Sequence, residues 1–342
     1  MNTIKTIFFG STNDSVIVLN KIFMLKIGNW KLDIACIVTQ PPKPVGRDQI
    51  ITPTPVETWA KEHKVPLLTF SSNTEKPWLY QDEASVIETL STFTPDLIIS
   101  ACYGQRIPSQ AIQKAKFGGI NVHPSLLPRW RGGDPVPWAI LAGDHQTGVS
   151  VVTLEKSFDE GNVLSQKKLP IHPTDFPDDL RTKLFTLGAD LLVELLPVML
   201  NNKISTHQKS MQNKEKLSRE AFPYARRLSR QDGFIPFELI EKALKGNDTS
   251  TIQQFNNFTI IKVALEHSED KQIDLPILIE RAFRAFTPWP GIWTTLNIKG
   301  EQKRLKILDV SINSSDQTLK IETVQLEGKT PVSWEQFKKA YL

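Results

Sequence analysis

The chain has 342 residues, of which 40% are hydrophobic and 23% are charged, a composition typical of a globular protein with room for two domains. We see no apolar run near the roughly 20 residues that cross a bilayer and no signal peptide, so we expect a cytoplasmic protein without a membrane partner. The only cysteines, Cys36 and Cys102, lie in apolar runs, which argues against a disulfide framework. The net charge of +4 is mild, and it indicates a charged partner only if the basic residues cluster.

The first half of the chain alternates apolar runs with amphipathic patterns. The runs are rich in β-branched residues and continuously apolar, as in a parallel sheet covered by helices on both faces. We therefore expect an α/β fold with a doubly wound, mostly parallel sheet, whose site lies at the carboxyl ends of the strands. The predicted strands are 5–9, 33–39, 96–101 and 119–122, and the predicted helices are 13–27, 56–64 and 83–93.

The pattern changes after about residue 202. Before that point, a predicted strand pair at 149–155 and 163–169 and a predicted helix at 177–200 complete a first domain, residues 1–202. Residues 203–230 are polar and strongly basic, which fits a solvated linker and a connector that touches a polyanion equally well. Residues 231–342 carry short runs with turn signals between them, which predict a small C-terminal β-barrel domain such as the OB type. The predicted strands there are 258–265, 293–298, 305–312 and 318–324.

The candidate site begins in residues 119–134, which read GINVHPSLLPRWRGGD. Side chains at i and i+2 of a strand share a face, so Asn121 and His123 project together. An amide can stabilise an oxyanion, and an imidazole can exchange a proton near neutral pH. An Asn-x-His pair alone is more often structural. The loop after it is bounded by Pro128 and contains Trp130, which fits a planar ligand and a core anchor equally well.

A third candidate is Asp159, in the glycine-ended turn Ser-Phe-Asp-Glu-Gly at 157–161. A carboxylate in such a turn is usually a turn residue. Here the turn joins two predicted strands and returns toward the same crevice. Asp159 would then orient His123 and stabilise its imidazolium form.

These motifs together resemble the folate-dependent formyltransferase family. The matching segments are Asn-x-His-x-Ser-Leu-Leu-Pro at 121–128, Arg-x-Arg-Gly at 129–132, the run at 138–149 and Asp-x-Gly at 159–161. The resemblance implies a Rossmann-like formyltransferase domain, catalytic roles for Asn121, His123 and Asp159, 10-formyltetrahydrofolate as co-substrate, and no metal. The Tyr-Gly-x-x-Ile-Pro segment at 103–108 resembles the border of the family's folate pocket. The folate contacts that follow are Tyr103, Gly104, Ile107, Ser125, Leu126, Leu127 and Pro128.

Further segments resemble the two-domain members of this family that act on initiator tRNA. They are 38–41, 46–47 and 53–56 in an inserted loop, 284–291 at the barrel entry and 325–333 at its end. The resemblance implies initiator Met-tRNA as partner, a monomer, and tRNA binding by residues 231–342. Phosphates would be contacted through cationic side chains. The tRNA contacts we expect are Arg47, Lys209, Lys214, Lys216, Arg226, Arg227, Lys303 and Arg304.

The chain departs from the family pattern at several positions, and alternatives stay open. Gly46-Arg47-Asp48 replaces Gly-Arg-Gly, Ser11-Thr12-Asn13 and Gly133-Asp134 are unusual, and residues 231–275 look like an insert without a role. A formyltransferase acting on a nucleotide-sugar amine and a 10-formyltetrahydrofolate hydrolase would use similar residues. A catalytically silent RNA-binding protein would not need all three of the candidate catalytic side chains.

Overall fold

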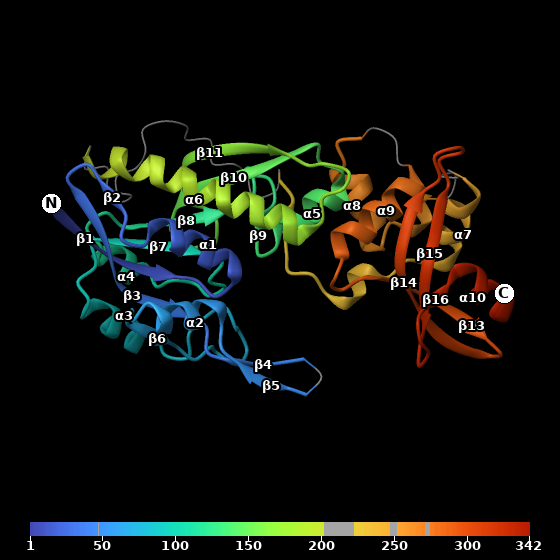
Figure 1. Ribbon diagram of the computed structural model, residues 1–342, viewed down its shortest axis with the longest axis horizontal. Helices are drawn as coiled ribbons and strands as arrows, with labels where there is room; N and C mark the ends of the chain where they lie inside the picture. Colours follow the sequence, from blue (N-terminus) through green and yellow to red (C-terminus); the bar gives the residue numbers. More distant parts are fainter. Residues whose placement is uncertain (47, 202–221, 247–251, 271–273) are drawn as a thin grey trace. The chain divides into compact units, whose positions relative to one another are not determined.

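The computed structural model describes residues 1–46, 48–201, 222–246, 252–270 and 274–342 (Figure 1). The chain divides into two compact units that interleave along the sequence. The first unit comprises Met1–Gly133, Gly148–Leu169 and Arg181–Tyr224. The second comprises Asp134–Thr147, Pro170–Leu180 and Ala225–Leu342. Residues 134–147, which contain a short helix, and residues 170–180 thus belong with the C-terminal third of the chain.

The first unit is built on an eight-stranded sheet in the order β11-β10-β8-β7-β1-β3-β2, with β6 paired to β3. Strand β1 runs parallel to β3 on one side and to β7 on the other, and β7 runs parallel to β8. The doubly wound, mostly parallel sheet predicted from the sequence is confirmed. Strands β10 and β2 are antiparallel to their neighbours β8 and β3. The strands are β1 (Asn2–Phe9), β2 (Lys26–Ile27), β3 (Trp30–Thr39), β6 (Leu67–Thr69), β7 (Leu97–Ala101), β8 (Gly119–His123), β10 (Gln146–Thr153) and β11 (Val163–Pro170).

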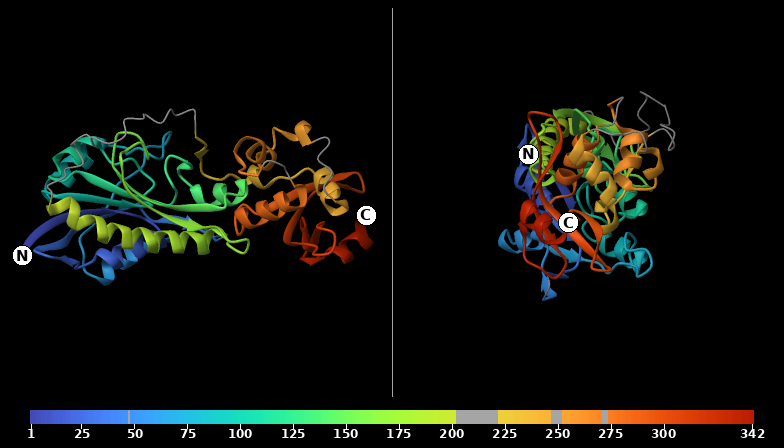
Figure 2. Two further views of the ribbon diagram at one scale, coloured as in Figure 1. Left: turned by 90° about the horizontal axis from the view of Figure 1, so that it is seen from above. Right: turned by 90° about the vertical axis from the view of Figure 1, so that its right-hand side faces the viewer.

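Helices cover both faces of this sheet (Figures 1 and 2). Ile4 and Phe8 of β1 pack with residues of α1, α2 and α6, whereas Ile7 and Phe9 pack with residues of α3 and α4. Both faces are therefore core, which is why the strands read as unbroken apolar runs; full burial of such side chains contributes roughly 1.5–3 kcal/mol each. The helices are α1 (Asn13–Ile22), α2 (Pro55–Glu62), α3 (Glu83–Ser91), α4 (Ser109–Lys114) and α6 (Pro177–Asn201).

Helix α6 corrects one expectation from the sequence. It has 25 residues and a mean hydropathy of 1.6 in its most apolar window, so by length and composition alone it could cross a membrane. Half of that window is buried within the protein, and Leu184, Phe185, Leu192 and Leu196 are fully buried. These features match a core helix that packs on the sheet.

Two local features of the first unit differ from the predicted pattern. The helix predicted at 13–27 ends at Ile22, because the chain reverses at Met24 (φ 56°) and Lys26–Ile27 becomes an edge strand. A hairpin of β4 (Lys43–Val45) and β5 (Ile50–Thr52) extends away from the body of the unit in Figure 1. It exposes Val45, Ile50 and Ile51 to solvent.

The second unit contains a four-stranded antiparallel sheet in the order β13-β14-β15-β16. This confirms a small C-terminal β domain after the α/β domain, whereas closure into an OB-like barrel stays a prediction. Helices α7, α9 and α10 contact the sheet. The elements are α5 (Pro135–Ala142), α7 (Phe237–Lys245), α8 (Thr259–His267), α9 (Leu275–Phe286), β13 (Ile292–Ile298), β14 (Glu301–Ile312), β15 (Leu319–Leu326), β16 (Val332–Ser333) and α10 (Trp334–Tyr341).

The strand predicted at 258–265 is wrong, because this segment is helix α8. The prediction followed its β-branched residues, but burial of Ile260, Ile261, Val263 and Ala264 follows the spacing of one helix face. Helix α5, which follows the candidate site loop, packs on α9 and ends at Gly143 in the left-handed region (φ 74°). A Cβ there would lie 2.0 Å from the Arg281 guanidinium, so only glycine fits.

Candidate active site

The three side chains predicted to be catalytic converge at the carboxyl end of β8. Asn121 and His123 lie on this strand, and Asp159 lies on the turn that follows β10, the antiparallel neighbour of β8. Asn121 Nδ2 donates to Asp159 Oδ1 at 3.3 Å, and His123 Nδ1 lies 3.3 Å from the same oxygen. An amide, an imidazole and a carboxylate therefore share one contact point.

The turn that carries Asp159 is tightly anchored to β10. The backbone N–H of Thr153 donates to the Asn162 carbonyl at 3.0 Å, and the Asn162 N–H donates to the Thr153 hydroxyl at 2.9 Å. A Cβ on Gly161 would lie 1.8 Å from the Thr153 carbonyl oxygen, so the turn needs glycine there. Asp159 itself has a φ of 54°, a strained conformation for a residue with a side chain. Such strain persists only where surrounding contacts hold the residue.

His123 is buried, with 4% of its side chain exposed, and both of its ring nitrogens face oxygen acceptors. Nδ1 faces Asp159, and Nε2 lies 3.2 Å from the carbonyl oxygen of Trp130. Burial disfavours the charged ring, but the charge and hydrogen bond of Asp159 and the Trp130 carbonyl outweigh it, so the pKa of His123 is raised above 6.5. Two acceptors require two N–H donors, so this geometry suits the imidazolium form.

Two backbone atoms of the following loop complete the arrangement, and sequence reasoning did not find them. The Gly132 N–H donates to Asp159 Oδ2 at 3.2 Å, and the Trp130 carbonyl accepts from His123. Trp130 is buried and has a φ of 57°. Main-chain atoms have no residue-type signature, and the only available signal was the glycine pair at 132–133.

A buried polar network fixes the start of this loop. Ser150, opposite His123 on β10, donates its hydroxyl to the Ser125 carbonyl at 2.6 Å and accepts from the Leu127 N–H at 3.2 Å. Gln166 of β11 donates to the Ser150 hydroxyl at 2.8 Å and to the Leu127 carbonyl at 2.9 Å. Ser150 and Gln166 were missed as well, although Ser150 interrupts the apolar run of β10 with a polar residue.

The residues predicted to contact folate are only partly accessible. Tyr103, Ile107, Ser125 and Leu127 are buried, and the Tyr103 hydroxyl accepts from Tyr80 at 3.0 Å. Gly104, Leu126 and Pro128 are partly exposed. Only the second set is directly accessible to a ligand. The assignment of the folate pocket stays a prediction.

A depression of about 510 Å³ lies elsewhere, between α3 and α4. Three of its polar residues already have partners, since Glu83 binds Arg106 and Lys114 donates to Ser91. We assign no substrate to it. Among the described residues, no group of three or more His, Cys, Asp or Glu side chains could hold a metal ion.

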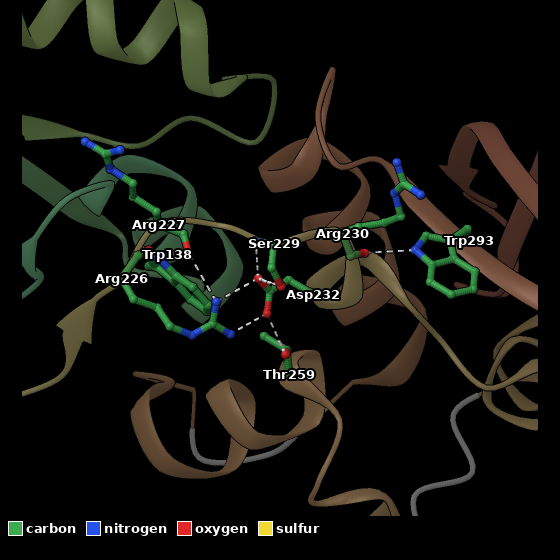
Figure 3. Close-up of polar contacts among 8 residues, drawn as sticks. All are labelled: Trp138, Arg226, Arg227, Ser229, Arg230, Asp232, Thr259 and Trp293. Atoms are coloured by element: carbon green, nitrogen blue, oxygen red, sulfur yellow. Dashed lines mark hydrogen bonds and ion pairs between the residues drawn. The ribbon is translucent and has the colours of Figure 1, made fainter. Parts of the chain in front are cut away.

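The predicted tRNA contacts divide into three sets. Arg47, Lys209, Lys214 and Lys216 lie outside the described residues. Arg227 is exposed and Arg304 is partly exposed, whereas Lys303 pairs with Glu301 at 2.5 Å. Arg226 is committed to a polar cluster within the second unit (Figure 3).

The centre of that cluster is Asp232, which is 1% exposed. Its carboxylate binds both terminal nitrogens of Arg226 and accepts from Ser229 and from Thr259 (Figure 3). Burial raises the pKa of Asp232, but the hydrogen bonds from Arg226, Ser229 and Thr259 outweigh it and lower the value below 3.8. The Arg226 guanidinium also lies 5.0 Å from the Trp138 ring. Half of the Arg226 side chain remains exposed.

Comparison with known proteins agrees with this fold and site. Residues 4–196 match the sequence profile of the family described as formyl transferase. The match covers more than half of the chain, including all three convergent side chains. The chain belongs to the formyl transferase family.

Individual relatives extend the likeness beyond that domain. The chain is 37% identical to the methionyl-tRNA formyltransferase of Listeria monocytogenes serovar 1/2a, over 92% of this chain and 81% of that protein. It is 38% identical to the methionyl-tRNA formyltransferase of Ehrlichia ruminantium strain Gardel, over 61% of this chain and 67% of that protein. For the methionyl-tRNA formyltransferase of Halalkalibacterium halodurans, the match is 37% identical and spans 60% of the relative.

A solved structure shows the same fold across both units. HypX from Aquifex aeolicus, in complex with tetrahydrofolic acid, aligns with 98% of this chain and 46% of its own, with a TM-score of 0.50 and 13% identity. At this identity the likeness concerns the fold.

Proposed function

We propose that the protein is a methionyl-tRNA formyltransferase. It transfers the formyl group of 10-formyltetrahydrofolate to the α-amine of methionine esterified to initiator tRNA, for translation initiation in the cytoplasm. The observation that carries the proposal is the meeting of Asn121, His123 and Asp159 at the end of β8. The relatives of the same name across 92% of the chain support the choice of acceptor.

The amine attacks the formyl carbon directly. The folate supplies an activated formyl group, and the protein stabilises the charge that forms on its oxygen. One N–H of the Asn121 amide is held by Asp159, which leaves the second N–H free to donate to that oxygen. The positive charge of the His123 imidazolium, held by Asp159 and the Trp130 carbonyl, adds electrostatic stabilisation of that oxygen.

The attacking amine must lose a proton, and the nitrogen that leaves the formyl carbon must gain one. The His123–Asp159 pair is placed for this exchange, because one proton can move between it and the two nitrogens without any covalent bond to the protein. The new carbon–nitrogen bond forms first and places the negative charge on the formyl oxygen. Collapse of this tetrahedral intermediate then breaks the bond to the folate nitrogen, which leaves with the proton it has gained. Burial of both side chains keeps bulk water from competing for the proton.

Each of three consecutive segments of the chain has its own proposed role. Residues 1–202 carry the chemistry, 203–230 form a basic linker, and 231–342 bind tRNA, with the protein acting as a monomer. Folate contacts come from the wall formed by Tyr103, Gly104 and Ile107 and by 125–128. Phosphate contacts come from Arg227, Arg304 and the basic residues outside the described part of the chain.

One assay tests the proposal. Purified protein is mixed with Met-tRNA and 10-formyltetrahydrofolate, and formyl-Met-tRNA is measured by mass spectrometry. A nucleotide-sugar amine replaces Met-tRNA in a parallel reaction, and formate is measured with no acceptor present. Formylation of Met-tRNA alone supports the proposal. Preferential formylation of the sugar amine, or formate release without any acceptor, would overturn it.

A further inference from the structure

Arg131 lies between the two loop residues whose backbone atoms touch the catalytic pair. The carbonyl of Trp130 accepts from His123, and the N–H of Gly132 donates to Asp159. Any displacement of Arg131 must therefore move both contacts together. The reaction chemistry described above assigns no task to its side chain.

The Arg131 side chain is held from two directions. Its Nη1 atom lies 3.1 Å from Glu160 Oε1, and its guanidinium carbon lies 5.7 Å from the centre of the Tyr224 ring. Only 22% of the side chain is exposed. Glu160 directly follows Asp159, so the ion pair connects the loop to the strained turn that carries the carboxylate. An exposed ion pair contributes only about 0–1 kcal/mol to stability. The Arg131–Glu160 pair matters here for a different reason, because it fixes the position of the turn.

Tyr224 holds the other side of Arg131. It lies in β12 (Tyr224–Ala225), which pairs with β9 (Arg131–Gly132) in a two-stranded sheet. Strand β9 thus has its backbone paired with β12 and its arginine placed between Tyr224 and Glu160. Tyr224 is 55% exposed, and its ring makes a cation–π contact with Arg131.

We propose that Arg131 is a positioning residue for formyl transfer. By linking Glu160 to Tyr224, Arg131 holds β9 against the Asp159 turn. Gly132 then keeps its hydrogen bond to Asp159, and Trp130 keeps its hydrogen bond to His123. Arg131 does not touch the substrate. A displacement of about 1 Å at a reacting group can cost roughly 10²-fold in rate, which is the size of effect a lost positioning contact produces.

The first experiment does not depend on the proposed function. The pKa of His123 is measured by NMR in the free protein, with its signals assigned through their loss in His123→Gln. In Arg131→Met, the pKa of His123 falls toward 6.5, because Asp159 is no longer held against the ring. Lys21→Met is the matched control, because it removes another ion pair of the first unit, Lys21 Nζ to Asp190 Oδ1 at 2.6 Å. It leaves the pKa unchanged.

The second experiment rests on the proposed function and uses steady-state kinetics with Met-tRNA and 10-formyltetrahydrofolate. Arg131→Met lowers kcat by roughly 10–10²-fold and leaves KM for Met-tRNA close to that of the wild type. Arg131→Lys retains the charge but not the planar fork, so it recovers part of the rate. Tyr224→Phe keeps the ring and behaves as the wild type, whereas Tyr224→Ala resembles Arg131→Met in direction.

Two results would overturn the proposal. If Arg131→Met raises KM for Met-tRNA while kcat and the pKa of His123 stay unchanged, Arg131 is an RNA contact. If only the free energy of unfolding falls, Arg131 is a structural brace. Failure of the wild type to formylate Met-tRNA would refute the proposed function, and the NMR titration would still decide the role of Arg131.

Discussion

Oδ1 of Asp159 lies 3.3 Å from Asn121 Nδ2 and 3.3 Å from His123 Nδ1, so a single oxygen aligns two side chains that leave the same strand. Its partner Oδ2 is fixed by the Gly132 N–H. The carboxylate acts here chiefly through its charge, because both of its side-chain neighbours are donors.

The first prediction therefore concerns Asp159→Asn, which keeps the shape and removes the charge. The pKa of His123 should fall, since the attraction of the carboxylate is lost while the cost of burial remains. We expect kcat to drop by roughly 10²–10⁴, the range for a misplaced acid or base. Asp33→Asn, on the exposed side of β3, is the control. Retention of most of kcat in Asp159→Asn would show that the charge has no catalytic role.

Asn121→Ala tests the amide separately. It removes a donor aimed at the site while leaving the buried imidazole and its carboxylate in contact. Loss of one such donor typically lowers kcat by ~10²–10³. The Asn121→Ala variant should form formyl-Met-tRNA slowly. Its circular dichroism spectrum should match that of the wild type, because Asn121 is only partly buried. An unfolded variant, or one with wild-type kcat, would count against the assignment.

The raised pKa of His123 also predicts how stability depends on pH. A folded-state pKa above the unfolded value of about 6.5 stabilises the protein fully below that value, and the contribution is lost as pH rises through the folded pKa. The free energy of unfolding, from urea titrations, should therefore decline above about pH 6.5. The decline should be shallower in His123→Gln. An equal decline in both proteins would assign it to other groups.

The sequence predicted the main features of the site because its signals are local. Alternation along a strand places Asn121 and His123 on one face, and the structure confirms that they converge. Asp159 lies far along the chain, and its place depends on β10 pairing antiparallel to β8, which no local pattern reveals. It was a candidate because its glycine-ended turn joins two predicted strands, and the motif resemblance supported that choice. Trp130 and Gly132 contribute main-chain atoms, for which the glycine pair at 132–133 was the only signal in the sequence.

The errors elsewhere have an equally physical origin. Residues 258–265 were predicted as a strand from residue type, and helical packing of Ile260 and Val263 outweighed that preference. The ion pair of Arg226 with Asp232 was not foreseen either, because Asp232 lies in the stretch that had seemed an insert without a role. The tRNA contact expected of Arg226 stays a prediction.

That cluster gives a fourth prediction, which separates stability from RNA binding. Asp232→Ala removes the buried acceptor shared by Arg226, Ser229 and Thr259, and a hydrogen bond to such a charged group contributes about 1.5–3 kcal/mol. Because the pKa of Asp232 is lowered in the folded state, its stabilisation is present above the unfolded value near 3.8 and is lost as pH falls through the folded pKa. The free energy of unfolding should therefore fall more steeply on acidification in the wild type than in Asp232→Ala. The urea midpoint at neutral pH should be lower in Asp232→Ala and in Arg226→Ala than in the wild type. An unchanged midpoint in both would show that the cluster is not structural.

The last prediction concerns salt. Neutralising phosphates with Lys and Arg releases counterions, so the KM for Met-tRNA should rise steeply with salt concentration, while the KM for 10-formyltetrahydrofolate should change little. Arg227 is exposed, so Arg227→Ala should raise KM for Met-tRNA. A plot of log KM against log salt concentration should have a slope smaller by about 1 than that of the wild type. The urea midpoint of Arg227→Ala should match that of the wild type. Arg226→Ala is the informative comparison, because its guanidinium is already paired with Asp232 and its main effect should be on stability. Equal salt responses of the two substrates would exclude the basic segment as the surface that binds tRNA.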